Sequence, residues 1–387
     1  MSWSQLSAEH FLRAADRLAR SILAERDAIE QHRSLPPNLA HEMREAGFFS
    51  LWLPKRFGGP ELSVADLVRV VEAVSRADGS AGWCAAIATS YSRLAGYLAE
   101  PSTHEIFRDG ASVLAGTLVP TGRAEVAPGG YRVTGRWSFG SGIGHSDWVL
   151  GVCRVFSGDT PQAAADGSPE LRLVIFPKAE TEVLDTWHVS GLRGTGSHDF
   201  RVKDIFVPEA RTMVWATPVP TTPGRLYALP VMTVFSTSVA GVPLGVARAA
   251  IDALMELAES KASVGSTQVL RDKPAIQAEI GRAEAILRSA RAFLFEAIQA
   301  LWDAGADATL RDRALVRLAL ANVGTSAAQV ADMMYRAGGS ASLYEGCRLA
   351  RCWRDAHAAA QHLGLSVANY ETAGRVMLGM DPGTTRF

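Results

Sequence analysis

Cysteine is scarce in this chain, and its spacing excludes the sites that cysteines most often build. The four cysteines are Cys84, Cys153, Cys347 and Cys352, and no two of them form a CxxC pair. Zinc sites need closely spaced ligands, and disulfide frameworks are typical of short secreted chains rather than of 387 residues. The composition therefore predicts no metal site and no disulfides, and it favours a reducing cytoplasmic location.

An excess of charge of one sign is also missing. Lysine and arginine total 39, aspartate and glutamate total 40, and no basic run or basic half of the chain stands out. A nucleic-acid partner is therefore not expected, because such proteins carry a basic patch. The N-terminal residues 1–20 alternate charged and apolar positions, so they do not form a secretory signal peptide.

Long hydrophobic runs are limited to one charge-free stretch, residues 228–247, which is long enough to cross a bilayer. It contains Pro230 and Pro243, together with several serine, threonine and glycine residues. Prolines interrupt a helix, so a spanning segment is a poor interpretation. We expect a buried loop that leads into a core helix, and no membrane span.

Hydrophobic periodicity divides the chain into three parts. Apolar residues recur at helical spacing through residues 1–110, with Ser63 as a candidate N-cap and Gly47 as a candidate helix end. Residues 111–220 contain short β-type runs without helices between them, which favours an antiparallel arrangement. Helical spacing returns in residues 221–387, where four long segments predict a bundle: 235–262, 274–303, 308–337 and 346–377. The predicted fold class is α+β, with an N-terminal helical domain, a middle antiparallel β-barrel and a C-terminal four-helix bundle.

The run from Trp137 to Gly142, WSFGSG, ends a predicted strand in small residues. Glycine lets a ligand approach the main chain, so Gly140, Ser141 and Gly142 are candidates for binding a planar heterocycle. Trp137 or Phe139 could stack on such a ring. The alternative is a strand that ends in a glycine-rich turn and keeps its aromatic side chains in the core. Composition alone favours this alternative.

A second glycine-rich segment, GLRGTGS, covers residues 191–197. Its amides and the hydroxyls of Thr195 or Ser197 could bind a phosphate or the edge of a flavin, although a plain hairpin turn explains the same residues. The segment lacks the lysine of a P-loop. Neither it nor residues 140–144 form GxGxxG between a strand and a helix, so a Rossmann site is excluded. A GxSxG nucleophile elbow is also absent.

The last helical segment concentrates charged and titratable residues. Arg351 and Asp355 are four residues apart, which predicts an ion pair on one helix face. His357 and His362 are five apart, which is poor geometry for a shared metal ion. A single histidine is more often structural than catalytic, so the pattern alone leaves the role of His362 open.

Three segments, in order, resemble the acyl-CoA dehydrogenase superfamily, and the likeness covers essentially the whole chain. Residues 48–84, FFSLWLPKRFGGPELSVADLVRVVEAVSRADGSAGWC, resemble its N-terminal helical domain. The β-domain of the superfamily is resembled by residues 191–208, GLRGTGSHDFRVKDIFVP. Its last helix is resembled by residues 337–362, AGGSASLYEGCRLARCWRDAHAAAQH. The resemblance implies an acyl-CoA dehydrogenase-like fold, a homotetramer, and a flavin between barrel and bundle.

One branch of the superfamily is favoured. Its dehydrogenases usually carry Glu-Gly-Thr soon after an Arg-Asp pair, whereas Arg354-Asp355 is followed here by AHAAAQHLGLS, without a glutamate base. Residues 137–148, WSFGSGIGHSDW, resemble the two-component flavin-dependent monooxygenases. This branch implies an oxygenase component that takes reduced FMN or FAD from a separate flavin reductase. It reacts with O2 through a C4a-hydroperoxide and hydroxylates a small substrate, aromatic or heterocyclic.

The same resemblance implies roles for individual residues. It places Ser141 beside flavin N5, and His362 near the substrate or the oxygen-reacting face, as a proton donor, an orienting group or a base. Phenol-hydroxylating relatives often have a histidine at the position that Tyr91 occupies here, counted from Trp83. Tyr91 therefore either replaces that histidine or orients a different substrate. The Arg-x-x-Phe-Gly signature of FAD-holding dehydrogenases is absent from residues 263–277, which permits loose binding of a diffusible flavin.

Two other functions stay open at this point. An acyl-CoA dehydrogenase with a displaced base would need an acidic residue from another helix, and Glu371 is the nearest later candidate. A non-catalytic flavin-binding paralogue would keep the fold without the chemistry.

Overall fold

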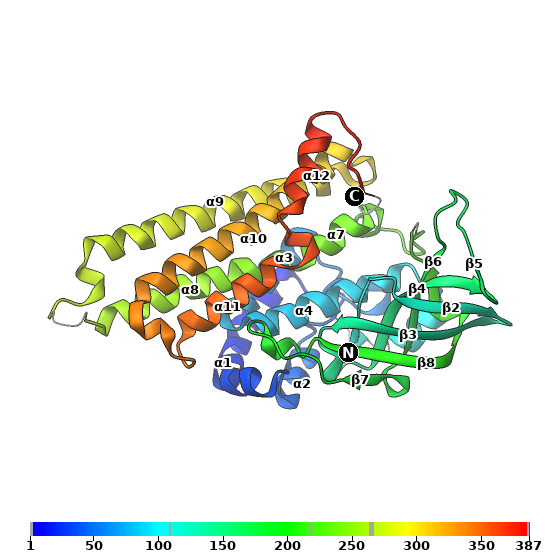
Figure 1. Cartoon of the computed structure of the whole chain (residues 1–387), viewed down its shortest axis with the longest axis horizontal. Helices are drawn as coiled ribbons and strands as arrows, with labels where there is room; N and C mark the ends of the chain where they lie inside the picture. Colours follow the sequence, from blue (N-terminus) through cyan, green and yellow to red (C-terminus); the bar gives the residue numbers. More distant parts are fainter. Residues whose placement is uncertain (1–2, 108–109, 217, 263–266, 385–386) are drawn as a thin grey trace.

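The computed structural model describes residues 3–107, 110–216, 218–262, 267–384 and 387. Figure 1 shows a sheet at one end of the molecule, the long helices α8 to α10 at the other, and α3 and α4 between them. The order of helices, sheet and helices is the predicted one, which confirms the predicted α+β class. The boundaries after residues 110 and 220 remain predictions. Residues 263–266, at the start of the segment searched for the FAD signature, lie outside the described residues.

The N-terminal helices begin and end where the sequence patterns indicate. The Ser63 side chain accepts a hydrogen bond from the Asp66 N–H and caps the third helix as expected. Gly47 follows the second helix with a φ of 80°, a backbone conformation that favours glycine. The described elements are α1 (Ala8–His32), α2 (Pro37–Glu45), η1 (Lys55–Phe57), α3 (Val64–Ala77), α4 (Gly79–Ser92), η2 (Arg93–Gly96) and α5 (Glu100–Ile106).

The middle region is one sheet of nine strands, in the order β7-β8-β3-β2-β4-β6-β9, with β1 and β5 also paired to β4. Most pairs are antiparallel as predicted, but β1–β4 and β2–β4 are parallel. Among the described residues no strand pair joins β7 to β9, so the hydrogen-bonded sheet does not close into the predicted barrel. The strands are β1 (Leu114–Gly116), β2 (Gly122–Ala127), β3 (Gly130–Gly140), β4 (Trp148–Ser157), β5 (Thr160–Pro161), β6 (Leu171–Pro177), β7 (Glu182–Leu184), β8 (His198–Pro208) and β9 (Thr212–Val214).

The C-terminal helices pack as a bundle, with two corrections. The predicted helix over 235–262 is interrupted between Ser238 and Gly241. The predicted single helix over 346–377 is two helices, α11 and α12, because the His362 side chain accepts the Gly364 N–H and caps a short 3-10 turn, η11 (Leu363–Leu365), between them. The apolar segment Val231–Ser260 lies inside the protein, with 89% of its most apolar window buried, as expected for a core helix. The helices are α6 (Arg225–Ala228), α7 (Val231–Ser238), α8 (Gly241–Ser260), α9 (Pro274–Ala304), α10 (Leu310–Gly338), α11 (Arg348–Ala360) and α12 (Ala368–Met377).

Candidate active site

Three of the predicted binding residues meet in one hydrogen-bonded cluster. Ser141 follows β3, Ser197 precedes β8, and Thr195 ends the 3-10 turn η6 (Arg193–Thr195). The Ser141 and Ser197 hydroxyl oxygens are 2.7 Å apart, and so are those of Ser197 and Thr195. All three residues are buried. The fold therefore joins the two glycine-rich segments that the sequence marked separately.

Backbone geometry explains why Ser141 turns toward this cluster. The register of β3 against β8 shifts between Trp137 and Gly140, and Phe139 inside that shift has a φ of 67°. Such a bulge re-aims the strand where the ladder ends. The Gly142 N–H then donates to the Thr195 carbonyl at 2.8 Å, which ties the bend to η6. The bend carrying Gly140 to Gly142 is held in place by main-chain bonds.

Trp83 on α4 extends the cluster toward the C-terminal helices. Its indole Nε1 donates to the Ser141 hydroxyl at 3.1 Å. The same indole meets the His362 ring edge to face, with ring centroids 5.4 Å apart. The sequence prediction used Trp83 only as a counting point and missed this role. Trp83 therefore connects the two residues that the resemblance singled out, Ser141 and His362.

The hydrogen bonds of His362 define which ring nitrogen carries the proton. Nδ1 accepts the Gly364 N–H at 3.1 Å, so in the neutral ring the proton sits on Nε2. Burial lowers the pKa of His362 to about 4, and the ring is neutral at physiological pH. Nε2 has no hydrogen-bond partner among the described residues. His362 thus offers one N–H, and the alternative role as a base is disfavoured because its only lone pair is occupied.

Trp137 does not belong to this group, which corrects the prediction that it contacts the flavin. Its indole is 1% exposed and stacks on Phe200, with ring centroids 5.4 Å apart. Its Nε1 donates to the Val152 carbonyl at 3.0 Å. The side chain fills the core of the sheet, as the structural alternative proposed. Phe139, by contrast, is 62% exposed, and its ring meets the Trp187 ring edge to face.

Tyr91 is buried against the sheet. Its hydroxyl donates to the Gly116 carbonyl at 2.9 Å, and burial raises the pKa of Tyr91. A phenol whose proton is engaged and whose anion is disfavoured is not suited to act as a base. Its ring and that of Trp215 both contact Phe235, with centroids 6.4 and 6.0 Å away, so the three form a buried aromatic cluster.

We expect Tyr91→Phe to lower the free energy of unfolding by about 1–3 kcal/mol, because the buried Gly116 carbonyl loses its donor. The pH profile of product formation is expected to stay that of the wild type. Chemical denaturation and a pH series of the initial rate measure the two effects. If the decline in rate at high pH disappears in Tyr91→Phe, then Tyr91 titrates during catalysis and this interpretation is wrong.

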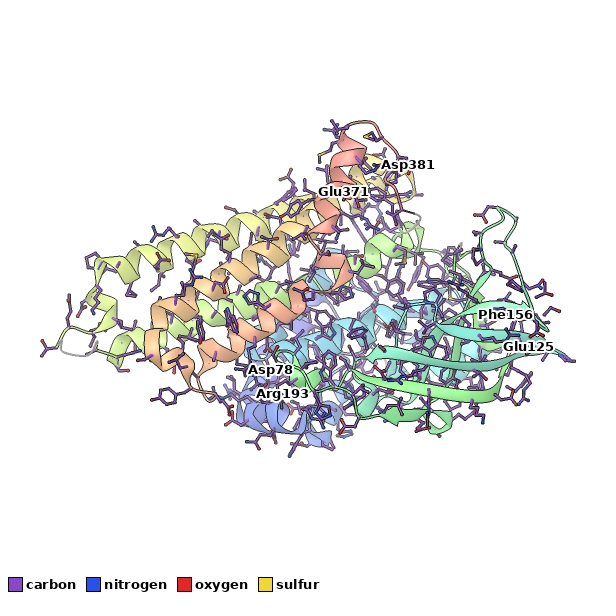
Figure 2. All side chains as sticks on the ribbon, viewed as in Figure 1. Asp78, Glu125, Phe156, Arg193, Glu371 and Asp381 are labelled. Atoms are coloured by element: carbon purple, nitrogen blue, oxygen red, sulfur yellow. The ribbon has the colours of Figure 1, made fainter. Side chains whose placement is uncertain are left out.

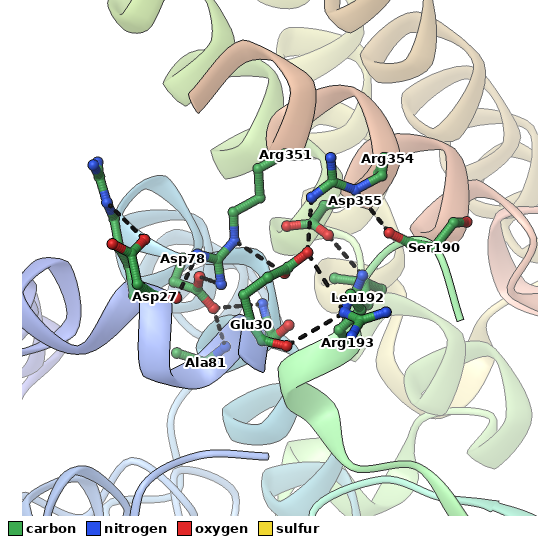
Figure 3. Close-up of polar contacts among 12 residues, drawn as sticks. Asp27, Glu30, Asp78, Ala81, Ser190, Leu192, Arg193, Arg351, Arg354 and Asp355 are labelled. Atoms are coloured by element: carbon green, nitrogen blue, oxygen red, sulfur yellow. Dashed lines mark hydrogen bonds and ion pairs between the residues drawn. The ribbon is translucent and has the colours of Figure 1, made fainter. Parts of the chain in front are cut away.

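A partly buried ion cluster, formed by Glu30, Asp78, Arg351, Arg354 and Asp355, joins α1, α4 and α11 (Figure 3). Arg351 pairs with Asp78 at 2.9 Å rather than with Asp355, so the predicted ion pair on one helix face is wrong. Arg354 pairs with Glu30 at 2.7 Å. Helix α11 reaches across to other elements because its polar face is turned into the protein.

The cluster also holds the loop before η6. Asp355 Oδ1 accepts the Leu192 N–H at 2.6 Å, and Arg354 donates to the Ser190 carbonyl at 2.8 Å. A side chain at Gly191 would collide with the Arg354 carbonyl, since its Cβ would lie 2.1 Å from that oxygen. The last helix therefore fixes the main chain that carries Thr195. A cavity of about 30 Å³ beside Asp78 and Asp355 has room for about one water, not for a flavin.

Burial, with the nearby Asp78 carboxylate, raises the pKa of Asp355 to about 7. Between pH 4 and 7 the folded protein then binds a proton at Asp355 that the unfolded chain has released, so this group's contribution to stability falls as pH rises. Asp355→Asn keeps an acceptor for the Leu192 N–H and removes the titration. We expect the difference in melting temperature, variant minus wild type, to increase from pH 4 to pH 7. A constant difference across that range contradicts the assignment.

Glu371, the displaced base required by a dehydrogenase, is exposed on α12. Figure 2 shows it close to Asp381 and far from Asp78 and Arg193, which mark the region of η6 and the ion cluster. The structure gives no support to a base at this position.

Both the sequence and the fold of this chain are similar to those of known flavin-dependent enzymes. Residues 7–105 match the family model "Acyl-CoA dehydrogenase, N-terminal domain", and residues 237–367 match "Acyl-CoA dehydrogenase, C-terminal domain". An indole-3-acetate monooxygenase of Pseudomonas putida is 33% identical over 356 residues, which cover 91% of this chain and 90% of that protein. The oxygenase component of an FADH(2)-dependent resorcinol hydroxylase of Rhizobium sp. is 28% identical, covering 91% and 90%. The solved structure of XiaF from Streptomyces sp., in complex with FADH2 and glycerol, superposes with a TM-score of 0.88 at 27% identity and covers 97% of each chain.

Proposed function

Because the chain belongs to the acyl-CoA dehydrogenase superfamily, and within it to the flavin-dependent monooxygenases, we propose that it is an oxygenase component that hydroxylates a small aromatic substrate with O2. The observation that carries the proposal is the match over nine-tenths of the chain to oxygenases such as the indole-3-acetate monooxygenase. A relative named for FADH(2) dependence and a neighbour bound to FADH2 support reduced FMN or FAD as the cofactor.

The residues of the cluster fit the edge of a flavin. Ser141 Oγ, already bonded to Trp83 and Ser197, keeps a free lone pair that can accept a hydrogen bond. His362 Nε2–H is a donor without a partner among the described residues. The Trp83 indole contacts both of these groups of opposite hydrogen-bonding sense, since it donates to Ser141 and meets the His362 ring edge to face. A planar heterocycle with adjacent donor and acceptor atoms could engage both, with Gly140 and Gly142 allowing close approach of its ring.

The bound flavin would supply the reaction with O2, which no side chain can carry out. The protein contributes position and hydrogen bonds. His362 holds a proton at Nε2, where it can donate to an oxygen atom close to the ring. The buried Trp83 indole, bonded to Ser141 and in contact with the His362 ring, would help to exclude water from a bound flavin.

We propose an aromatic or heterocyclic substrate. The names of two relatives, which specify indole-3-acetate and resorcinol, point the same way. The two-component relatives imply a separate flavin reductase as the source of the cofactor. A homotetramer and a cytoplasmic location complete the proposal.

The test supplies reduced FMN or FAD from an added reductase, with indole-3-acetate and resorcinol as probes, under an ¹⁸O2 atmosphere. We expect one labelled oxygen atom in the aromatic product. Bleaching of the oxidised flavin by an acyl-CoA, without O2, would instead identify a dehydrogenase. Flavin binding without a labelled product from any aromatic probe would identify a non-catalytic paralogue.

A further inference from the structure

Four consecutive hydrogen bonds form a chain through the active site, which we call the hydroxyl chain. It runs from the Trp83 indole to Ser141, from Ser141 to Ser197, from Ser197 to Thr195, and from Thr195 to the Leu192 carbonyl. The four donor–acceptor distances are 3.1, 2.7, 2.7 and 2.8 Å. The three hydroxyl-bearing residues are all at least nine-tenths buried. Each bond is therefore short and shielded from water.

The two ends of the hydroxyl chain determine the direction of every bond in it. An indole N–H can only donate, and a main-chain carbonyl can only accept. Thr195 uses its single proton on the Leu192 carbonyl, so the proton between Thr195 and Ser197 comes from Ser197. The proton between Ser197 and Ser141 then comes from Ser141. Four bonds use four hydrogens, and only this arrangement satisfies all of them.

The acceptor end is held firmly. Leu192 is 4% exposed and has a φ of 51°, and its N–H is fixed by Asp355 at 2.6 Å. Its carbonyl also accepts the Trp187 indole N–H at 3.2 Å. Reversal of the chain would leave this buried carbonyl without the Thr195 proton, and Ser141 would then accept from both Trp83 and Ser197, so that its own proton would have no acceptor among the described residues. Both changes cost free energy, so the direction persists.

The consequence lies at Ser141, whose proton is committed to Ser197. We propose that Ser197 and Thr195 are positioning residues that hold Ser141 as a hydrogen-bond acceptor, so that the site prefers a reduced flavin, which bears N5–H, over an oxidised flavin. An oxidised flavin presents a lone pair at N5, and two lone pairs repel. This inference rests on the proposed function, since it takes Ser141 as the partner of N5. The inference adds a physical cause for the preference for reduced flavin, and it assigns that cause to Ser197 and Thr195, which do not contact the flavin ring themselves.

The decisive variant is Ser197→Ala, which removes the acceptor of the Ser141 proton and lets Ser141 donate. Dissociation constants for oxidised and for reduced FMN and FAD are measured anaerobically, with and without dithionite, by titration calorimetry. We expect the ratio of the two constants, oxidised over reduced, to fall about tenfold. Thr195→Val interrupts the chain one residue further on and is expected to lower the ratio in the same direction. It also provides a second test if Ser197→Ala folds poorly.

Two control variants distinguish an effect of hydrogen-bond direction from a general disturbance of the site by loss of a side chain. Ser146→Ala removes another buried hydroxyl, one that donates to the Ile143 carbonyl outside the chain, and is expected to keep the wild-type ratio. Ser92→Ala removes a further buried hydroxyl, one that donates to the Thr89 carbonyl at 2.8 Å outside the chain, and is also expected to keep the wild-type ratio. Loss of a hydroxyl inside the hydroxyl chain, rather than loss of any buried hydroxyl, should change the ratio.

The proposal is overturned if Ser197→Ala and Thr195→Val bind both flavins with the wild-type ratio, or if Ser146→Ala shifts the ratio as much as they do. In either case a wild type that still incorporates labelled oxygen leaves the proposed function intact. A wild type that binds neither form of FMN or FAD rejects both proposals.

Discussion

Replacing His362 with alanine is expected to lower product formation about 100-fold to 1,000-fold, the range typical of a lost proton-donating group. The affinity for reduced flavin is expected to stay within about threefold, because one neutral hydrogen bond contributes little to binding. The structural reason is the free Nε2–H, held in place by the Gly364 N–H on the opposite nitrogen and by the edge of the Trp83 ring. Single-turnover product yield and anaerobic titration measure the two effects.

His357→Ala is the matched control for this prediction. His357 lies on the preceding helix, α11, and its Nε2 is 3.0 Å from Asp332. Its removal should leave product formation nearly unchanged. His362→Gln, which keeps an N–H donor, is expected to recover part of the lost rate. If His362→Ala and His357→Ala turn over equally, His362 has no part in the chemistry.

Ser141→Ala is expected to raise the release of hydrogen peroxide more than tenfold, since about 1.5 kcal/mol of hydrogen bonding at the flavin is lost. Reduced flavin would still be oxidised, but a smaller share of the oxygen would reach the substrate. The coupling ratio, product formed per flavin oxidised, reports this directly. Ser138→Ala, an exposed serine on the same strand, serves as the control and should keep the wild-type ratio. An unchanged coupling ratio in Ser141→Ala removes Ser141 from the proposed role.

The fold was largely predictable because its signals are local. Helical periodicity and caps such as Ser63 depend on neighbouring residues, and the structure confirms them. Strand β2 has a weak sequence signal because GRAEVA has little β-character; it is held by pairing with β3, which follows it after a two-residue turn, and with the more distant β4. The break at His362 was missed because a histidine that caps a turn with its own ring leaves no pattern in the sequence.

The candidate site was only partly predictable, and Trp137 shows why. Tyr131, Val133 and Trp137 alternate along β3, which places all three on the core face, so the information was present in the sequence. Phe139 continues that alternation, yet the bulge turns it outward. The bond from Trp83 to Ser141 spans residues far apart in the chain, and neither residue type predicts the other.

The turn between α11 and α12 gives His362 an unusual source of orientation. Many enzymes align a reactive imidazole with an aspartate or glutamate, whose negative charge also favours the protonated, cationic ring. Here a peptide amide does the aligning, and it brings no countercharge. The ring should therefore keep the same ionisation state from mildly acidic to mildly alkaline conditions, so fluctuations in cellular pH would leave its proton where the reaction needs it.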